Sequence, residues 1–136
     1  MLTQFVLKNV LSFKEETVFD MRAINAYKEH PENTADSGYG DKILRVATIY
    51  GANASGKSNF TLAMYIFRAI VAESLNNAND GKLLAIHKFY LPFLLSEEKA
   101  NSEFEIVNII DDAEYRYGFE YNDECIVEEW LYKKNL

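Results

Sequence analysis

Residues 51–58 read Gly-Ala-Asn-Ala-Ser-Gly-Lys-Ser and match the pattern G-x-x-x-x-G-K-[ST], which is called Walker A. The run directly before them, Ile43–Tyr50 (ILRVATIY), is compact and apolar, which predicts a buried strand. After the motif, residues 58–75 place apolar side chains at helical spacing, and the Asn-rich segment 76–81 is expected to end that helix. A strand, a glycine-rich loop and a helix in this order predict an α/β (α+β) fold of the P-loop NTPase type.

The residue types of the motif suit the binding of a phosphate. Gly51 and Gly56 let the backbone turn tightly, so that its N–H groups form an anion nest at the helix N-terminus. Lys57 is the expected catalytic residue because it reaches the β- and γ-phosphates, and the Ser58 hydroxyl is the expected metal ligand for Mg²⁺. The residues predicted to bind ATP are Gly51, Asn53, Ala54, Ser55, Gly56, Lys57, Ser58 and Asn59. The alternative is a chance glycine-rich turn that caps a helix, and the flanking strand and helix favour nucleotide binding.

The rest of the chain predicts further strands. Residues 1–8 and 17–21 are apolar and β-prone, whereas residues 22–42 are rich in turn formers and read as a long loop. Beyond residue 102 the hydrophobic period changes to two, in three runs over 104–110, 115–121 and 126–132. Such runs with short turns between them are typical of an antiparallel meander with one buried face.

Length and composition indicate a single domain. The chain has 136 residues, of which 49% are hydrophobic, so it can build a core of its own. It has one cysteine, Cys125, which excludes an internal disulfide and favours a reducing, cytoplasmic setting. We expect Cys125 to be packed and inert on a strand. No apolar run approaches the roughly 20 residues of a membrane span, and the N-terminus shows no secretory signal, so no membrane partner is expected.

The charge distribution limits the choice of partners. The net charge of −7 argues against a stand-alone nucleic-acid binder, which normally carries a basic face. Residues 97–136 hold four basic and twelve acidic side chains, whereas residues 1–60 hold seven of each. An anion site is therefore expected in the first half of the chain.

Three segments together resemble a known family. GANASGKSNF (51–60), FVLKNVLSFKEE (5–16) and the stretch from Pro92 to Tyr132 are similar to the ABC-type ATPases of the RecF/SMC and OLD-nuclease group. Within that group, the closest likeness is to small bacterial AAA-named, ABC-like ATPases that are linked to phage defence. The resemblance covers most of the chain and is weakest over 22–42 and 76–90.

The resemblance implies that residues 1–136 are a single domain, the N-terminal lobe of an ABC-type head without its C-terminal half. Such a head has a mixed sheet, a P-loop helix and an antiparallel layer, and two heads sandwich ATP between them as a homodimer. The turn after the first strand lies near the nucleotide in that family, which implies that Ser12 and Phe13 contact the base or ribose. The alternative is a simple strand-ending turn with Phe13 in the core. A DNA or nuclease partner fits the family but has no support from the charge.

Three functional hypotheses remain open. The chain lacks a recognisable signature motif and Walker B, so the leading hypothesis is ATP binding, with hydrolysis only in the presence of the missing half and a second head. Residues 106–112 (IVNIIDD) imitate a Walker B, and a self-contained NTPase or kinase would use Asp111 or Asp112 on Mg²⁺ and water. Because Asp favours turns, a hairpin turn is the preferred interpretation. The third hypothesis is a non-catalytic nucleotide-binding module. The tyrosines of 115–121 could stack on bases, but core packing is preferred.

Overall fold

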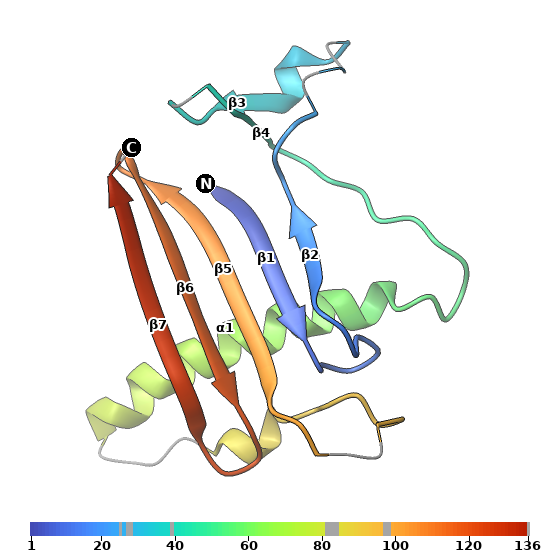
Figure 1. The fold of residues 1–136 in the computed structure, drawn as a ribbon, viewed down its shortest axis with the longest axis vertical. Coiled ribbons are helices and arrows are strands. Elements are labelled where there is room, and N and C mark those ends of the chain that lie inside the picture. The colour runs from blue at the N-terminus through green and yellow to red at the C-terminus, as the bar shows by residue number, and fades with distance from the viewer. Residues whose placement is uncertain (25, 27–28, 39, 81–84, 97–98, 136) are drawn as a thin grey trace.

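The computed structural model describes residues 1–24, 26, 29–38, 40–80, 85–96 and 99–135, and only the backbone of residues 75–80. Within those ranges it forms a five-stranded sheet crossed by one long helix, with a small two-stranded sheet beside them (Figure 1). The elements are β1 (Leu2–Lys8), β2 (Thr17–Asp20), η1 (Pro31–Asn33), β3 (Thr34–Asp36), β4 (Lys42–Leu44), α1 (Lys57–Asp80), η2 (Ile86–Lys88), β5 (Ser102–Ile110), β6 (Ala113–Tyr121) and β7 (Ile126–Asn135).

The large sheet has the order β2-β1-β5-β6-β7, and every neighbouring pair is antiparallel. β1 pairs with β5 in a register that places Phe5 opposite Ile106 and Leu7 opposite Phe104. The predicted N-terminal strands and the meander of β5, β6 and β7 are confirmed. The predicted mixed sheet is wrong for the described residues, because the large sheet contains no parallel pair there.

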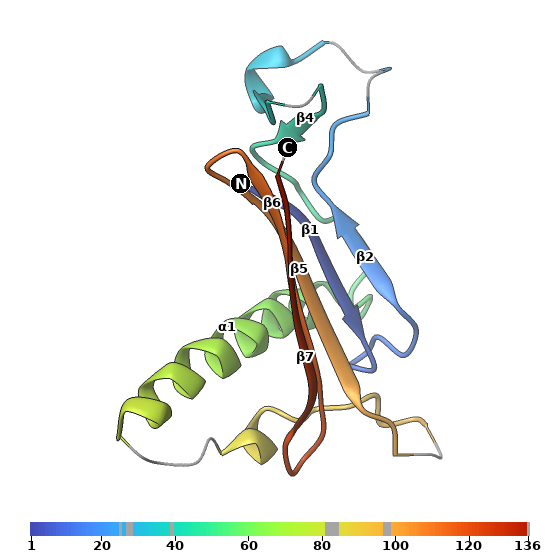
Figure 2. The same ribbon diagram turned by 60° about the vertical axis from the view of Figure 1, so that its left-hand side comes forward.

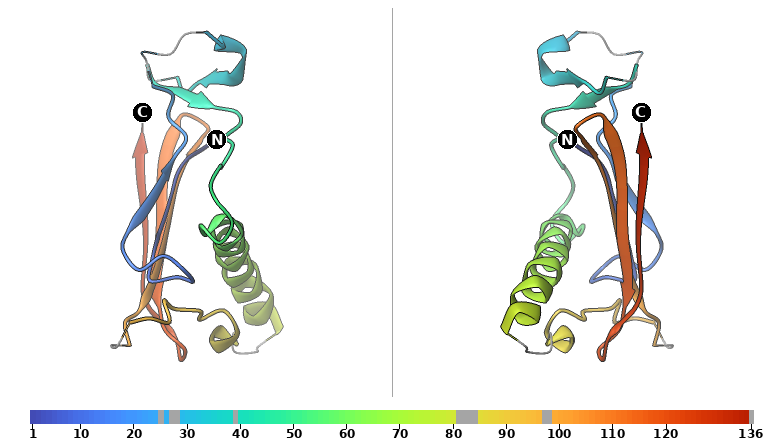
Figure 3. Two further views of the ribbon diagram at one scale, coloured as in Figure 1. Left: turned by 90° about the vertical axis from the view of Figure 1, so that its right-hand side faces the viewer. Right: turned by 90° about the vertical axis from the view of Figure 1, so that its left-hand side faces the viewer.

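Helix α1 covers one face of the sheet, as the turned views show (Figures 2 and 3). Its apolar side chains pack on an aromatic layer contributed by the strands. Phe67 of the helix stacks on Phe119 with ring centroids 5.6 Å apart, and Phe5 meets Phe60 edge-on at 5.9 Å. Such aromatic contacts add to the free energy gained from burying the rings.

Two of the three tyrosines of β6 contribute to this core: Tyr121 belongs to it, and Tyr117 packs against it. Tyr121 is fully buried and donates from its hydroxyl to the carbonyl oxygen of Phe89 at 3.1 Å. Tyr117 donates to Glu129 at 2.8 Å, and burial raises the pKa of both tyrosines above its usual range. The prediction of core packing rather than a base-stacking platform is therefore confirmed for Tyr117 and Tyr121, whereas Tyr115 lies outside the core cluster.

The segment before the helix departs from prediction. The predicted buried strand Ile43–Tyr50 is limited to its first residues, because β4 ends at Leu44. It pairs with β3 and bridges to Arg22 through Ile43. Residues 45–50 are exposed, with Val46 at 67% and Tyr50 at 86% of full exposure. An apolar run becomes a buried strand only when neighbouring strands and a covering layer are present, and among the described residues no strand lies beside 45–50.

Other boundaries differ in smaller ways. α1 continues to Asp80 through the asparagines that were expected to end it, because asparagine costs a helix only about 0.7 kcal/mol relative to alanine. Gly81 lies outside the described residues. Cys125 lies in the β6–β7 turn and is exposed, so the prediction of a packed strand cysteine is wrong. No helix in the described part of the chain is long and apolar enough to cross a membrane.

On the face of the sheet away from α1, Gly118 accommodates the indole ring of Trp130. A Cβ on Gly118 would lie 2.5 Å from Trp130 Cζ2 and 2.6 Å from the backbone oxygen of Phe104. The indole N–H donates to Glu105 at 2.9 Å, and Glu105 also lies 3.6 Å from the Arg116 guanidinium. Trp130 thereby ties β7 to β5 across β6.

We expect Gly118→Ala to lower the free energy of unfolding by about 1–3 kcal/mol, because the added methyl group displaces the Trp130 ring and presses on backbone. Urea denaturation followed by circular dichroism measures the change. Tyr65→Ala, an exposed position on α1, is the control and should alter stability far less. Equal stability of Gly118→Ala and the parent chain would contradict this packing.

Candidate functional site

Residues 51–58, called the loop 51–58 below, comprise the turn 51–56, which follows the exposed segment 45–50, and the first two residues of α1 (Figure 1). Ala54 and Gly56 both have positive φ, at 64° and 90°. The Phe60 N–H donates to the Gly56 carbonyl at 2.9 Å, which begins the helical hydrogen bonding. The N–H groups of the preceding first-turn residues then have no acceptor within the helix, and helix N-termini of this kind attract anions.

The Lys57 side chain folds back over this loop. Its Nζ donates to the carbonyl oxygens of Gly51 at 2.7 Å and Ala52 at 2.6 Å, and it lies 3.4 Å from Ser55 Oγ. These three acceptors carry no net charge, so they do not neutralise the ammonium group. The predicted residues Gly51, Ser55 and Lys57 are thus brought together.

A Cβ on either glycine of the loop would crowd a neighbouring serine hydroxyl. A Cβ on Gly51 would come within 2.5 Å of Ser55 Oγ. A Cβ on Gly56 would lie 3.0 Å from Ser12 Oγ and 3.8 Å from Phe13 Cζ. Gly56 is therefore constrained both by its φ and by the chain that presses against it.

The chain beside Gly56 is the turn of residues 9–14, which follows β1. Val10 and Phe13 exchange two backbone hydrogen bonds of 2.9 Å, and Leu11 has a φ of 55°. Phe13 lies edge-on to Phe60 with centroids 6.4 Å apart, which places the turn against the first turn of α1. The structure therefore brings Ser12 and Phe13 beside the loop, and Phe13 is also partly in the core.

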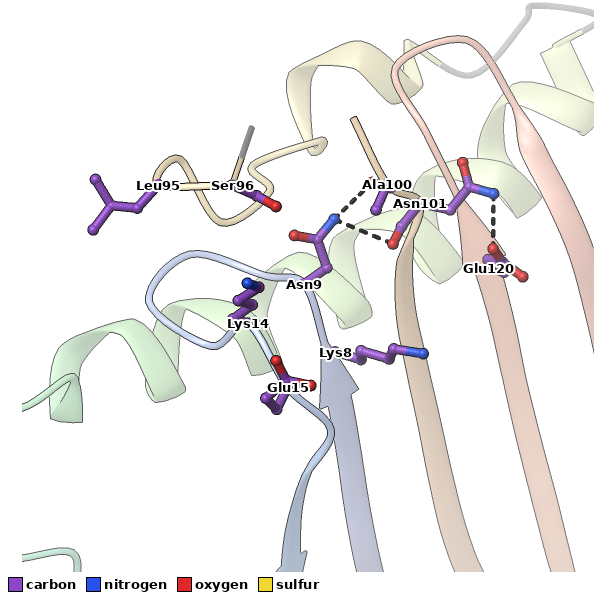
Figure 4. Close-up of a pocket in the computed structure, with 9 residues that line it drawn as sticks. All are labelled: Lys8, Asn9, Lys14, Glu15, Leu95, Ser96, Ala100, Asn101 and Glu120. Atoms are coloured by element: carbon purple, nitrogen blue, oxygen red, sulfur yellow. Dashed lines mark hydrogen bonds between the residues drawn. The ribbon is translucent and has the colours of Figure 1, made fainter. Parts of the chain in front are cut away.

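Asn9 holds this turn to the segment that precedes β5 (Figure 4). Its Nδ2 donates to the carbonyl oxygens of Ala100 at 2.6 Å and Asn101 at 3.2 Å, while its Oδ1 accepts from the Phe93 N–H at 3.1 Å. These bonds border a pocket of about 640 Å³ that carries charges of both signs. Its lining is Lys8, Asn9, Lys14, Glu15, Leu95, Ser96, Ala100, Asn101 and Glu120.

A second, apolar pocket lies between the turn and α1. It has a volume of about 400 Å³ and is lined by Leu11, Ser12, Asn59 and the segment from Tyr90 to Leu95. Residues 90–95 were missed by the sequence reasoning. The run Leu-Pro-Phe-Leu-Leu at 91–95 was the available signal, because an apolar cluster around a proline is unusual in a loop, and Leu94 and Leu95 are indeed exposed.

The Walker B-like segment lies elsewhere. Asp111 and Asp112 have φ values of 44° and 60° and form the two-residue turn between antiparallel β5 and β6, which confirms the hairpin interpretation. Ile109 bonds to Met1 at the start of β1, whereas Ser12 follows the end of β1. The length of β1 thus separates these acids from Gly56 by roughly 20 Å. The described residues contain no cluster of three or more His, Cys, Asp or Glu that could hold a metal ion.

Comparison with protein families decides the broader class. A family model described as "AAA domain, putative AbiEii toxin, Type IV TA system" matches residues 46–136, about two thirds of the chain. The chain belongs to this AAA domain family. The matched region includes the loop 51–58, α1 and the β5–β7 meander. Membership of the AAA domain family supports a nucleotide-binding function of the ATPase type, and such domains generally bind ATP with Mg²⁺. No curated protein and no solved structure gives a significant match.

We expect Gly56→Ala to destabilise the fold by about 1–3 kcal/mol, because alanine resists a φ of 90° and its methyl group meets Ser12. Gly40→Ala is the matched control, since Gly40 has a φ of 92° but nothing within 4 Å of a built Cβ. Denaturation midpoints should show the larger loss for Gly56→Ala, and Ser12→Gly should recover part of the difference. Equal losses at both glycines would show that the turn does not press on the loop.

Proposed function

We propose that the loop 51–58 binds the triphosphate of ATP together with Mg²⁺. The observation that carries this proposal is the position of Lys57, whose ammonium is held inside the loop by two backbone carbonyls at the N-terminus of α1. An ammonium and a row of helix N–H groups that face the same loop favour a multiply charged anion over any neutral ligand.

The residues present fit such a ligand. Gly56 adopts a φ of 90° that glycine tolerates best, and a Cβ on Gly51 would crowd Ser55 Oγ within the loop, so both glycines suit a tight turn around a phosphate. In the proposed complex, Lys57 exchanges its carbonyl acceptors for the β- and γ-phosphate oxygens and stabilises the charge that develops there. The exposed Ser58 hydroxyl, on the first turn of α1, would hold Mg²⁺, which when bound neutralises phosphate charge. Asn53, Ala54 and Ser55 supply loop N–H groups, and Asn59 supplies one more.

The base and ribose of ATP are proposed to lie toward Ser12 and Phe13. Support comes from the position of Ser12, whose Oγ would lie 3.0 Å from a Cβ on Gly56, and from the adjoining apolar pocket, where Ser12 and Asn59 offer polar groups beside apolar walls. A purine ring has an apolar face and a polar edge, which suits a pocket lined in this way.

We further propose that the domain is the N-terminal lobe of an ABC-type head of the RecF/SMC kind, which pairs with a second head as a homodimer. The exposed apolar side chains of Val46, Ile49 and Tyr50, directly before the loop, support this proposal. Surfaces of this kind mark places where other protein packs. A role in phage defence, with a nuclease or DNA as partner, remains a proposal from family resemblance. A cytoplasmic location remains a proposal from the single cysteine.

Hydrolysis by this chain alone is not expected. The self-contained NTPase hypothesis placed the Mg²⁺ and water groups on Asp111 and Asp112, and these lie at the far end of β1 from the loop. The ATPase reaction is therefore assigned to the complete head in a dimer. A non-catalytic nucleotide-binding module remains the second candidate function, and it would bind the nucleotide at the same loop.

The test is the affinity of the 136-residue chain for Mg·ATP, measured by isothermal titration calorimetry. We expect Lys57→Ala to weaken binding by about 10- to 100-fold, because one charge-assisted contact to phosphate is lost. Lys88→Ala removes an equal charge at an exposed position on η2 and should leave the affinity unchanged.

Equal affinity in the Lys57 variant and the parent chain would overturn the proposed phosphate site. Steady-state turnover measured on the same samples separates the hypotheses on catalysis. Turnover that disappears with Lys57→Ala would show that the chain is a complete enzyme, whereas binding without turnover agrees with the lobe interpretation.

A further inference from the structure

The strand β7 is a long edge of the large sheet. Its ten residues, Ile126–Asn135, pair with β6 on one side, and among the described residues no strand pairs with the other side. Figure 1 shows β7 running the full height of the sheet at its outer margin. The opposite edge, β2, has only four residues. Long exposed edges present unpaired backbone groups that readily accept another strand.

The side chains of β7 are also unusual for a solvent-exposed edge. Every described residue of the strand is exposed except Trp130, which is half-buried. Four of the exposed side chains are large and apolar, with Leu131 at 65% and Tyr132 at 62% of full exposure. This edge thus combines unpaired backbone with apolar surface, and a partner strand would cover both.

The charges along β7 are self-complementary. The N-terminal half carries Glu128 and Glu129, and the C-terminal half carries Lys133 and Lys134. Leu131 lies midway, because 128 and 134 are equally far from it, as are 129 and 133. In an antiparallel pair of two identical strands centred on Leu131, each glutamate therefore faces a lysine of the other strand.

We propose that β7 pairs antiparallel with β7 of a second copy of this chain, with the two-fold axis at Leu131. In this register Glu129 faces Lys133 of the second copy, Glu128 faces Lys134, and Trp130 faces Tyr132. The two sheets join into one continuous sheet, and the interface is isologous, as is usual for two-fold dimers. Opposite charges in directly facing positions stabilise strand pairs, and like charges in those positions destabilise them.

The side chains of β7 already point as this pairing requires. Alternation along the strand places Glu129, Leu131 and Lys133 on the face covered by α1, since they lie opposite Phe119, Tyr117 and Tyr115 of β6. Glu128, Trp130, Tyr132 and Lys134 lie on the other face. Glu129 accepts from the Tyr117 hydroxyl at 2.8 Å, and Lys133 Nζ lies 5.5 Å from the centre of the Tyr115 ring. Both charged groups are thus positioned by tyrosines of β6, and each can still form another hydrogen bond or ion pair.

The pairing is separate from the nucleotide-dependent pairing of heads proposed above. It uses an edge of the sheet rather than the loop 51–58, so it should form without nucleotide and persist in Lys57→Ala. A dimer that forms only with Mg·ATP, and disappears with Lys57→Ala, would support head pairing and count against the β7 pairing.

Charge swaps test the proposal by sedimentation equilibrium without nucleotide. The double variants Glu128→Lys/Glu129→Lys and Lys133→Glu/Lys134→Glu should each dimerise about tenfold or more weakly than the parent, because like charges then face each other. An equimolar mixture of the two double variants should form heterodimers, and the quadruple variant should recover the homodimer. This recovery excludes misfolding as the cause of the loss.

Cross-linking provides a second measurement with a different readout. In a Cys125→Ser background, Leu131→Cys places two thiols at the two-fold axis, where facing residues of paired strands have Cβ atoms roughly 4.5–5.5 Å apart. Mild oxidation should give a disulfide-linked dimer, whereas Leu62→Cys, exposed on α1, should not. A parent chain that stays monomeric at its highest soluble concentration, or a dimer that is insensitive to the charge swaps, overturns the proposal.

Discussion

The packing around Phe60 determines where the candidate site lies. This residue is 6% exposed and contacts Phe5 of β1, Phe19 of β2 and Phe13 of the following turn, with centroid distances of 5.9, 5.0 and 6.4 Å. Its N–H also donates to the carbonyl of Gly56. One buried ring therefore fixes the first turn of α1 against two strands and the turn 9–14. The loop before the helix has its position because these four elements meet at Phe60.

The arrangement separates charge along the sheet. The loop 51–58, with Lys57 at its centre, lies near the end of β1 that leads into Ser12, whereas Asp111 and Asp112 lie at the opposite end of the sheet. The acid-rich segment 97–136 contains the meander, whose strand glutamates are spread along the sheet, with Glu103 and Glu120 near its Lys8 end. An anionic ligand at the loop would thus lie away from Asp111 and Asp112, though not from every acid of the meander.

Much of this fold could be predicted from the sequence, because the relevant signals are local. Period-two alternation identified β5 and β6, helical spacing identified α1, and the turn preference of Asp111 and Asp112 identified the hairpin between them. The failures concern long-range burial. The segment 45–50 is as apolar as a buried strand, but burial depends on neighbours that its own residues do not encode.

The roles of the site residues stay predictions. The motif named the loop residues, and family resemblance implied that Ser12 and Phe13 contact the base or ribose. The structure places both side chains near Gly56, whereas their contact with a nucleotide stays a prediction. The pocket lined by Tyr90–Leu95 was not predicted, because these residues form a loop without a periodic pattern. The loop packs against the turn 9–14, where the Leu11 N–H donates to the carbonyl oxygen of Leu91. Periodic sequence patterns identify helices and strands, but they do not predict where a loop packs against another part of the chain.

The turn 9–14 and Phe60 hold the loop and the start of α1 in position, and we propose that a triphosphate binds there. Amide hydrogen exchange of the 136-residue chain should be measured with and without Mg·ATP, because the N–H groups of the loop and first helical turn would become hydrogen-bonded to phosphate. Added Mg·ATP should slow exchange within residues 51–60 and leave exchange in the β6–β7 pairing unchanged. Unchanged exchange throughout 51–60 at saturating Mg·ATP would show that no triphosphate binds at this loop.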